Sequence, residues 1–276
     1  MRPFFKLVSS RTCDFTVGGM FMWRDFYKMK FAVEDSAFIS KMTFPDGGEF
    51  FLLPLSADPE RSVKRLIENE NGHVNFADIP EEYVPLLLKI CPNAKVSEQT
   101  ELADYLYNAA DLITLAGRKY SGQRNLINQF KRSVPNITVK DIGEVPSDIS
   151  ADFLQNVYRE AANANSEEKN ENREALEVIQ NLGEYGMIGC ALFSGERMLG
   201  FSLGEKLGDT LYTHIEKADR NVNGAYQTLV HEFSSRCGAD VKYINREEDM
   251  GDAGLRRAKL AYHPAAMLKK YTVEVH

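Results

Sequence analysis

The sequence predicts a mixed α/β protein of the α+β type, built as two domains. Its 276 residues suit two domains of average size. Runs with the period-two alternation of strands are interleaved with segments of helical periodicity. Turn signals between neighbouring strand runs favour mixed, mostly antiparallel sheets flanked by helices. Residues 136–146 form the best candidate boundary, so we expect domains at 1–136 and 137–276.

The first half contains a predicted hairpin and a predicted capped helix. Strands are expected at residues 38–44 and 49–55, joined by a Pro-Asp-Gly-Gly turn that is typical of hairpins. Asp58 and Pro59 are suited to the start of a helix that runs to about residue 70. The other expected elements are a strand at 74–77, a helix at 81–91, extended segments over 94–109 and a helix at 121–133. Residues 104–111 fit either a strand or a loop.

The second half has a more regular order of elements. The expected elements are a strand at 138–142, a helix at 148–164, a polar segment at 165–172 leading into a helix to 182, strands at 187–193, 198–206 and 209–216, a helix at 225–237, a strand at 240–245, a helix at 255–262 and a strand at 271–275. This order resembles that of the GNAT acetyltransferase fold. We find no convincing sequence repeat between the two halves.

The composition argues against several classes of protein. A net charge of −7 disfavours indiscriminate nucleic-acid binding. The four cysteines form no Cys-x-x-Cys pair, which disfavours a structural zinc site and a disulfide framework. No apolar run approaches the length of about twenty residues that spans a bilayer, and the N-terminus is a poor signal peptide, so we expect a cytoplasmic protein. No serine-hydrolase elbow, P-loop or metal-spaced histidine pair is present, and no metal is expected.

The most informative stretch covers residues 244–264. An acidic cluster follows a predicted buried strand, where α/β proteins usually place ligand sites. A glycine-containing turn then leads into a helix on which Arg256 and Lys259 are neighbours. Like charges repel unless an anion lies between them. That anion is either Glu247, Glu248 or Asp249, in a structural ion-pair cluster, or a phosphate or carboxylate of a ligand.

Two segments without acidic residues, 112–140 and 253–272, suggest a local anionic ligand, although solvated helix faces explain them equally well. The first of these includes Arg124, on the predicted helix at 121–133. A cluster of methionine and aromatic side chains at residues 20–27 is expected to be core. Its alternative role is the lining of a pocket for an acyl chain or lipid.

The predicted strand at 211–216 and the loop after it form a second candidate region. Period-two alternation would place Tyr212, His214 and Glu216 on one face, where they suit amine deprotonation, or else a solvent-facing side. GNAT enzymes grip a donor pyrophosphate with a loop close to Arg/Gln-x-x-Gly-x-Gly/Ala. Here the loop begins at Arg220, and Asn223 replaces the first glycine. Asparagine tolerates a positive φ, but a plain helix-start loop explains the sequence about as well.

The chain resembles a bacterial family related to the C-terminal catalytic domain of phosphatidylglycerol lysyltransferases. The matching stretches are residues 15–23 (FTVGGMFMW), 105–124 (YLYNAADLITLAGRKYSGQR) with Asn125, and 216–227 (EKADRNVNGAYQ). The most specific match is Asn-x-Glu-x-Asp-x-Gly followed by Leu-Arg-x-x-Lys-x-x-Tyr-x-Pro, at residues 245–264. The resemblance spans nearly the whole chain.

This resemblance implies two GNAT-like domains in tandem, as in the aminoacyl-tRNA-dependent transferases that build peptidoglycan bridges. In the lipid-modifying relatives, the donor is an aminoacyl-tRNA and the acceptor is phosphatidylglycerol. Those relatives carry a multi-span membrane domain before the catalytic part, and this sequence shows no such segment. A lipid acceptor that the protein reaches from the membrane surface therefore remains one of the alternatives.

We expect an acyltransferase that moves an aminoacyl group from an aminoacyl-tRNA-type donor to a lipid or small-molecule acceptor. The alternatives are an N-acetyltransferase that uses acetyl-CoA on a small molecule, and a non-catalytic ligand-binding module with the same fold. No tightly bound cofactor is expected, and the oligomeric state is not predicted. The predicted site residues are the catalytic Glu216, Glu247 and Asp249; the donor-loop residues Arg220, Asn223, Gly224, Ala225, Tyr226 and Gln227; and the substrate-binding residues Tyr120, Arg124, Asn125, Tyr212, His214, Asn245, Arg246, Arg256, Lys259 and Tyr262.

Overall fold

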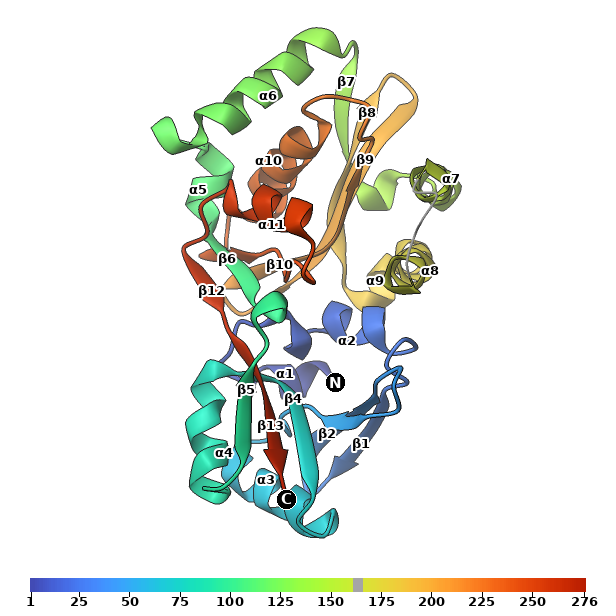
Figure 1. The fold of residues 1–276 in the computed structure, drawn as a ribbon. Helices are drawn as coiled ribbons and strands as arrows, with labels where there is room; N and C mark the ends of the chain where they lie inside the picture. The colour runs from blue at the N-terminus through green and yellow to red at the C-terminus, as the bar shows by residue number, and fades with distance from the viewer. Residues whose placement is uncertain (161–165) are drawn as a thin grey trace. The chain divides into compact units, whose positions relative to one another are not determined.

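The computed structural model describes residues 1–160 and 166–276 (Figure 1). The chain forms two compact units, and each unit is discontinuous in sequence. Unit 1 consists of Met1–Tyr105, Glu247–Arg256 and Met267–His276, and unit 2 of Leu106–Arg246 and Arg257–Ala266. The predicted helix at 148–164 and polar segment at 165–172 fall in part outside the described residues. No helix among the described residues is both long and apolar enough to cross a membrane.

Unit 1 is built on a six-stranded sheet of order β1-β2-β3-β4-β13-β5. Its strands are β1 (Lys30–Glu34), β2 (Ala37–Thr43), β3 (Glu49–Phe51), β4 (Val74–Pro80), β5 (Lys95–Glu98) and β13 (Lys270–Val275). Its helices are α1 (Arg2–Phe5), α2 (Val17–Trp23), α3 (Pro59–Asn69) and α4 (Val84–Ile90). The predicted β2–β3 hairpin is confirmed, and the Asp58 carboxylate caps α3 by accepting the Arg61 N–H.

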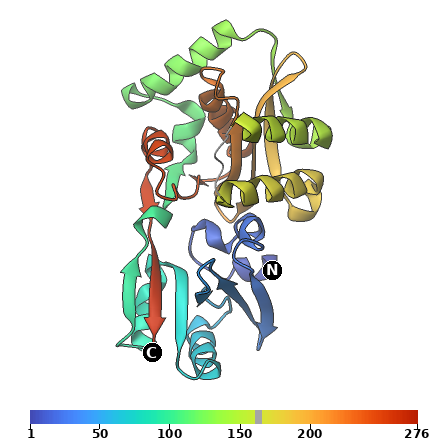
Figure 2. The same ribbon diagram turned by 45° about the vertical axis from the view of Figure 1, so that its right-hand side comes forward.

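Unit 2 contains most of a seven-stranded sheet of order β12-β6-β11-β10-β9-β8-β7. The strands are β6 (Asp104–Asn108), β7 (Ile137–Asp141), β8 (Ile188–Ser194), β9 (Arg197–Leu207), β10 (Thr210–Ala218), β11 (Tyr243–Asn245) and β12 (Ala266–Leu268). The helices that accompany it are α5 (Ala109–Thr114), α6 (Ser121–Ser133), α7 (Ser147–Glu160), α8 (Ser166–Gln180), α9 (Leu182–Tyr185), α10 (Ala225–Cys237) and α11 (Ala253–Leu260). Figures 1 and 2 show α7 and α8 on one face of the sheet, and α10 with α6 on the other.

The two sheets repeat one pattern of connections. Three antiparallel strands are followed by a helix, by a strand parallel to the third strand, and then by a second helix and another strand. This pattern runs from β1 to β5 and again from β8 to β12. Beside the parallel strand, unit 1 takes β13 from the C-terminal end of the chain, and unit 2 takes β6 from the segment that follows β5. The predicted tandem of GNAT-like units with mostly antiparallel sheets is confirmed.

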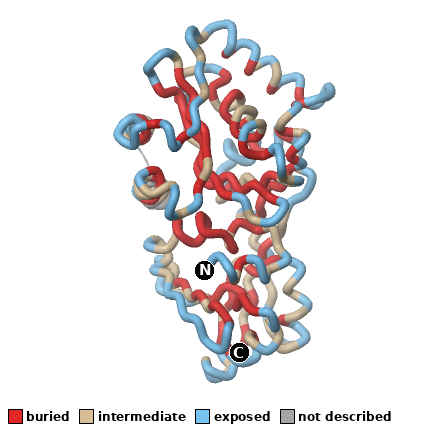
Figure 3. The backbone as a smooth tube through the Cα atoms, turned by 180° about the vertical axis from the view of Figure 1, so that it is seen from behind, coloured by how far each residue is buried: buried red, intermediate tan, exposed pale blue. Residues whose placement is uncertain are grey.

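The bounds of the two compact units differ from the predicted domains, 1–136 and 137–276. The reason is that β6 pairs with β11, and that α5 and α6 pack against α10, so these early segments belong to unit 2. Sequence periodicity records local structure and carries no information about which sheet a strand joins. Buried residues follow the strands of both sheets (Figure 3). Both cores are therefore completed by strands that lie far away in the sequence.

Candidate functional site

The two parallel strands of unit 2 separate at their carboxyl ends. β10 pairs with β11 only from Thr210–Tyr243 to Tyr212–Asn245, whereas β10 stays paired with β9 as far as Ala218. The β9–β10 register shifts between Thr213 and Ile215, which marks a β-bulge. Bulges re-aim side chains and are common beside active sites, and ligands of open α/β sheets bind at the carboxyl ends of strands.

Glu216 of β10 and Arg246, directly after β11, form an ion pair at this separation. Arg246 Nη2 donates to Glu216 Oε1 at 2.8 Å, and the side chains are only 11% and 13% exposed. The guanidinium lies 5.0 Å from the ring centroid of Tyr262 and 5.8 Å from that of Tyr107. Burial lowers the pKa of Arg246, but the interactions with Glu216, Tyr107 and Tyr262 together outweigh it, so the pKa lies above its ordinary value. We call Tyr107, Glu216, Arg246, Lys259 and Tyr262 the Arg246 cluster.

Hydrogen bonds to backbone carbonyls hold the Arg246 cluster in place. Lys259 Nζ donates to the Arg246 carbonyl at 2.6 Å, and the Tyr107 hydroxyl donates to the Lys259 carbonyl at 2.8 Å. The Tyr120 hydroxyl donates to the Tyr262 carbonyl at 3.2 Å. These bonds fix the end of α11 and the turn after it, and hence the position of the Tyr262 ring. Lys259 and Tyr120 therefore position the cluster.

Three buried donor atoms of the cluster have no hydrogen-bond partner among the described residues. They are Nε and Nη1 of Arg246 and the hydroxyl oxygen of Tyr262, whose residue is 4% exposed. Burial also raises the pKa of Tyr262, so its hydroxyl keeps its proton. Unpaired buried donors are rare in native proteins because each costs about 1–3 kcal/mol. Donors grouped beside a carboxylate can hold the oxygen of a carbonyl, carboxylate or phosphate.

His214 occupies the bulge of β10, and its side chain is hydrogen-bonded to Glu205. Its Nε2 lies 3.1 Å from Glu205 Oε1, and its ring stacks with that of Tyr212, at 6.4 Å between centroids. The bulge inserts one residue into the strand, so period-two alternation does not carry across it. The structure thus brings Tyr212 and His214 together, while it pairs the carboxylate of Glu216 with Arg246.

The predicted donor loop packs tightly against helix α6. Gly224 has φ +81°, and a β-carbon there would lie 2.3 Å from the Leu126 carbonyl oxygen. The left-handed residue is thus Gly224, while Asn223 donates from its side chain to Gln129 at 2.9 Å. The other loop residues differ in exposure: Arg220 is exposed, Ala225 is buried, and Tyr226 and Gln227 are half-buried. Close packing on α6 is sufficient reason for glycine at position 224.

Asp249 and Arg256 form the structural ion pair that was one of the two predicted alternatives. Arg256 donates from Nε and Nη2 to the two Asp249 oxygens at 2.8 and 2.7 Å, and the Tyr105 hydroxyl donates at 2.6 Å. The Gly251 N–H donates a fourth bond. Burial raises the pKa of Asp249, but these donors outweigh it and hold the pKa below its usual range. A carboxylate held this way is poorly suited to accept a proton from substrate.

The remaining predicted residues differ in exposure and in the groups that they contact. Arg124 donates to the carbonyls of Leu115 and Gly117, which satisfies the C-terminal end of α5. Asn125 is exposed, and Asn245 is fully buried at the end of β11. Glu247 belongs to unit 1 and has φ +58°, and its carbonyl accepts the Tyr105 N–H at 3.1 Å.

Comparison with known proteins identifies relatives over the whole chain. The family model described as phosphatidylglycerol lysyltransferase, C-terminal, matches residues 5–274. A crystal structure of a conserved protein of unknown function from Bacteroides thetaiotaomicron VPI-5482 is 27% identical and superposes with a TM-score of 0.90, over 100% of this chain and 96% of that one. The structure of L-PGS from Bacillus licheniformis is 14% identical, with a TM-score of 0.65 over 99% of this chain and 90% of that one.

A curated relative is known only as an uncharacterized protein of Mycoplasmoides gallisepticum. It is 25% identical over 177 residues, which are 62% of this chain and 56% of that protein. The chain therefore spans just over half the length of that relative. The likeness to the Bacillus licheniformis protein concerns the fold alone.

Proposed function

Since the chain belongs to the phosphatidylglycerol lysyltransferase C-terminal family, we propose that it is an aminoacyltransferase whose reacting centre is the Arg246 cluster. The donor would be an aminoacyl-tRNA-type ester and the acceptor a hydroxyl or amine on a lipid or small molecule. One observation carries the proposal: three unpaired donor atoms lie beside a carboxylate, where the parallel strands of unit 2 separate. Acyl transfer requires this combination of a base and oxyanion donors.

In the proposed reaction, Arg246 and Tyr262 donate hydrogen bonds to the carbonyl oxygen of the donor ester. Glu216 accepts the proton of the acceptor hydroxyl or amine as its heavy atom attacks the carbonyl carbon. The tetrahedral intermediate carries its negative charge on the oxygen that Arg246 and Tyr262 hold. Its collapse breaks the ester bond, and the proton on Glu216 passes to the departing ribose oxygen. Positioning and carbonyl polarisation thus supply the rate enhancement.

The charges of unit 2 support an anionic donor. The segment from Leu112 to Lys140 has no acidic residue, and five of its cationic side chains are exposed: Arg118, Lys119, Lys131, Arg132 and Lys140. Exposed arginine and lysine neutralise phosphates and make binding salt-dependent. The loop at Arg220 favours this donor over acetyl-CoA, because Asn223 replaces the first glycine of the GNAT pyrophosphate motif.

Transfer from charged tRNA tests this proposal. The chain is mixed with tRNA charged with radiolabelled amino acids, with and without phosphatidylglycerol vesicles, and label is followed in lipid-soluble and water-soluble products. We expect loss of transfer in Arg246→Met and Tyr262→Phe, and normal transfer in Arg236→Met, an exposed arginine on α10 that pairs with Glu232. Transfer only from acetyl-CoA would instead support the acetyltransferase alternative, and no transfer from either donor a non-catalytic module.

A further inference from the structure

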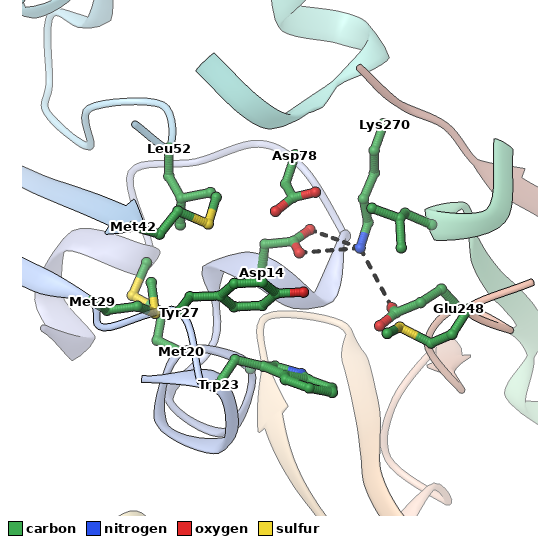
Figure 4. Close-up of a pocket in the computed structure, with 13 residues that line it drawn as sticks. Asp14, Met20, Trp23, Tyr27, Met29, Met42, Leu52, Asp78, Glu248 and Lys270 are labelled. Atoms are coloured by element: carbon green, nitrogen blue, oxygen red, sulfur yellow. Dashed lines mark hydrogen bonds and ion pairs between the residues drawn. The ribbon is translucent and has the colours of Figure 1, made fainter. Parts of the chain in front are cut away.

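Unit 1 contains a cavity of about 50 Å³ with one apolar and one charged end. The apolar wall is formed by Met20, Trp23, Tyr27, Met29, Met42 and Leu52. Asp14, Asp78, Glu248 and Lys270 line the charged end. Figure 4 shows the carboxyl groups turned toward the Lys270 ammonium, and Met20, Met29 and Met42 on the opposite side. The cluster at residues 20–27 thus contributes both core and pocket lining, since Phe21 and Met22 are buried in the core.

Lys270 is fully buried at the charged end and lies among carboxyl groups. Its Nζ is 2.9 Å from an oxygen of Asp14, 2.9 Å from one of Asp104 and 3.5 Å from one of Glu248. The residue is 1% exposed, so its charge requires these partners. Asp78 lies beside this group and interacts electrostatically with Lys270 and Glu248. One ammonium therefore faces four carboxyl groups.

The excess of carboxyl groups leaves negative charge that Lys270 does not neutralise. Burial raises the pKa of Asp14 to about 7 and that of Asp104 to about 6, and the Lys270 charge only partly opposes this effect. Near neutral pH, these groups therefore compete for protons that a cation can replace. An ammonium group that enters this end of the cavity would be attracted by carboxylates whose charge Lys270 does not fully balance.

Asp78 is the carboxylate best placed to meet a ligand. Among the described residues, its carboxylate forms no hydrogen bond or ion pair with another side chain, and it lines the cavity. Its φ is +52°, and the β4–β13 register shifts around it, from Tyr271–Ile79 to Val273–Phe76. This bulge turns the side chain out of the regular alternation of β4 and toward the cavity.

A metal ion fits the charged end less well than an ammonium group does. Cys13, Asp104 and Glu248 bring ligand atoms within 4.8 Å of one another. The Lys270 ammonium already lies against all three, at 3.5 Å from the sulfur of Cys13 and at the distances given above from the carboxylates. Burial raises the pKa of Cys13, so its thiol stays protonated and is a poor metal ligand.

We propose that the unit 1 cavity binds the ammonium group of a small primary amine. The ammonium lies against Asp78, Asp14 and Glu248, and its short alkyl stem lies on the methionine wall beside Trp23 and Tyr27. Thioethers adapt to irregular apolar shapes, and aromatic faces attract cations. The proposal uses no residue of the Arg246 cluster. It can therefore fail or hold independently of the proposed aminoacyl transfer.

Trp23 is the only tryptophan of the chain and lines the cavity, so its fluorescence reports directly on occupancy. The full chain is titrated at pH 7.5 with butylamine, 1-butanol and butyrate, which share the stem and differ in the polar group. We expect saturable binding of butylamine, with an affinity at least about tenfold above that of 1-butanol, since a charge-assisted hydrogen bond adds about 1.4 kcal/mol or more. Butyrate is expected not to bind.

Asp78→Asn tests the assigned carboxylate, because asparagine keeps the shape and tolerates the positive φ. We expect it to weaken butylamine binding about tenfold or more, while Asp46→Asn, at an exposed hairpin turn of the same unit, leaves binding unchanged. If Asp78→Asn does not fold, Glu248→Gln takes its place, with the same expected loss. Equal affinities for butylamine and 1-butanol, unchanged binding in the folded variant, or no saturable response to butylamine would each overturn the proposal.

Discussion

Replacing the Arg246–Glu216 pair by apolar side chains separates its structural from its functional role. In Glu216→Met, the guanidinium loses its countercharge and the acceptor of its Nη2 bond while it is 11% exposed. Removing one partner of a buried pair costs about 3–5 kcal/mol, and we expect a loss of this size in the free energy of unfolding. Arg246→Met leaves Glu216 unpaired at 13% exposure, and we expect a loss of about 2 kcal/mol in the free energy of unfolding.

The double variant Arg246→Met with Glu216→Met has a different expected result. It removes both charges and the unpaired Nε and Nη1 donors, and it fills the space between the Tyr107 and Tyr262 rings. Buried ion pairs replaced by apolar groups of similar volume are often neutral or more stable, so we expect stability within about 1 kcal/mol of the parent. The two single losses would sum to about 5–7 kcal/mol, so the coupling energy of the cycle would be about 4–7 kcal/mol.

Urea unfolding followed by circular dichroism measures these four free energies. Trp23 fluorescence, which reports on unit 1, distinguishes the transition of that unit from that of unit 2. A double variant that is stable but inactive would show that the pair is kept for function. If the two single losses simply add in the double variant, the two side chains are not coupled and the argument fails.

Three further results follow from the structure. Gly224→Ala should lower the free energy of unfolding by about 2–4 kcal/mol, because the added β-carbon would clash with the Leu126 carbonyl and because φ is positive at this position. An unchanged urea midpoint would contradict this packing. Arg256→Gln should lower the free energy of unfolding at pH 7 only modestly, because Arg256 is 44% exposed. This loss should disappear in acid, where Asp249, whose pKa is lowered, becomes protonated; a loss that does not depend on pH would refute the ion pair. Burial raises the pKa of Asp78 to about 6, so its bound proton stabilises the folded state below about pH 4, and this contribution is lost as the pH rises through 6. Relative to Asp78→Asn, the parent should lose on the order of 1 kcal/mol in the free energy of unfolding over this window. A gain in the stability of the parent over the same window would contradict the raised pKa.

Much of the fold could be predicted from the sequence because local signals were strong. The Pro-Asp-Gly-Gly turn, the Asp58 cap and the order of strands and helices in the second half all appear in the structure. The sequence contained no signal that β13 joins the sheet of unit 1 or that β6 joins the sheet of unit 2. Pairing between strands that are far apart in the sequence depends on tertiary packing. Residues 104–111 fitted a strand or a loop, yet they form β6 and the first half of α5.

The candidate site was predictable in part. Glu216, Arg246, Lys259 and Tyr262 belonged to the predicted set and lie together. The neighbouring strands β10 and β11 position Glu216 and Arg246, and α11 with the turn after it positions Lys259 and Tyr262. Tyr107 was missed, since its segment had no clear periodicity. The charged end of the unit 1 cavity was also missed. Lys270 begins an alternating strand, and burial of a lysine among carboxylates depends on contacts that a single sequence does not contain.

The most direct test of the proposed function is single-turnover deacylation of charged tRNA by excess protein. With saturating acceptor, Glu216→Gln and Arg246→Met should each slow the release of the aminoacyl group by about 10²-fold or more, which is typical for loss of a general base or of an oxyanion donor. Binding of the charged tRNA by Glu216→Gln should change little. Equal single-turnover rates in the parent and both variants would contradict the assignment of the Arg246 cluster as the reacting centre.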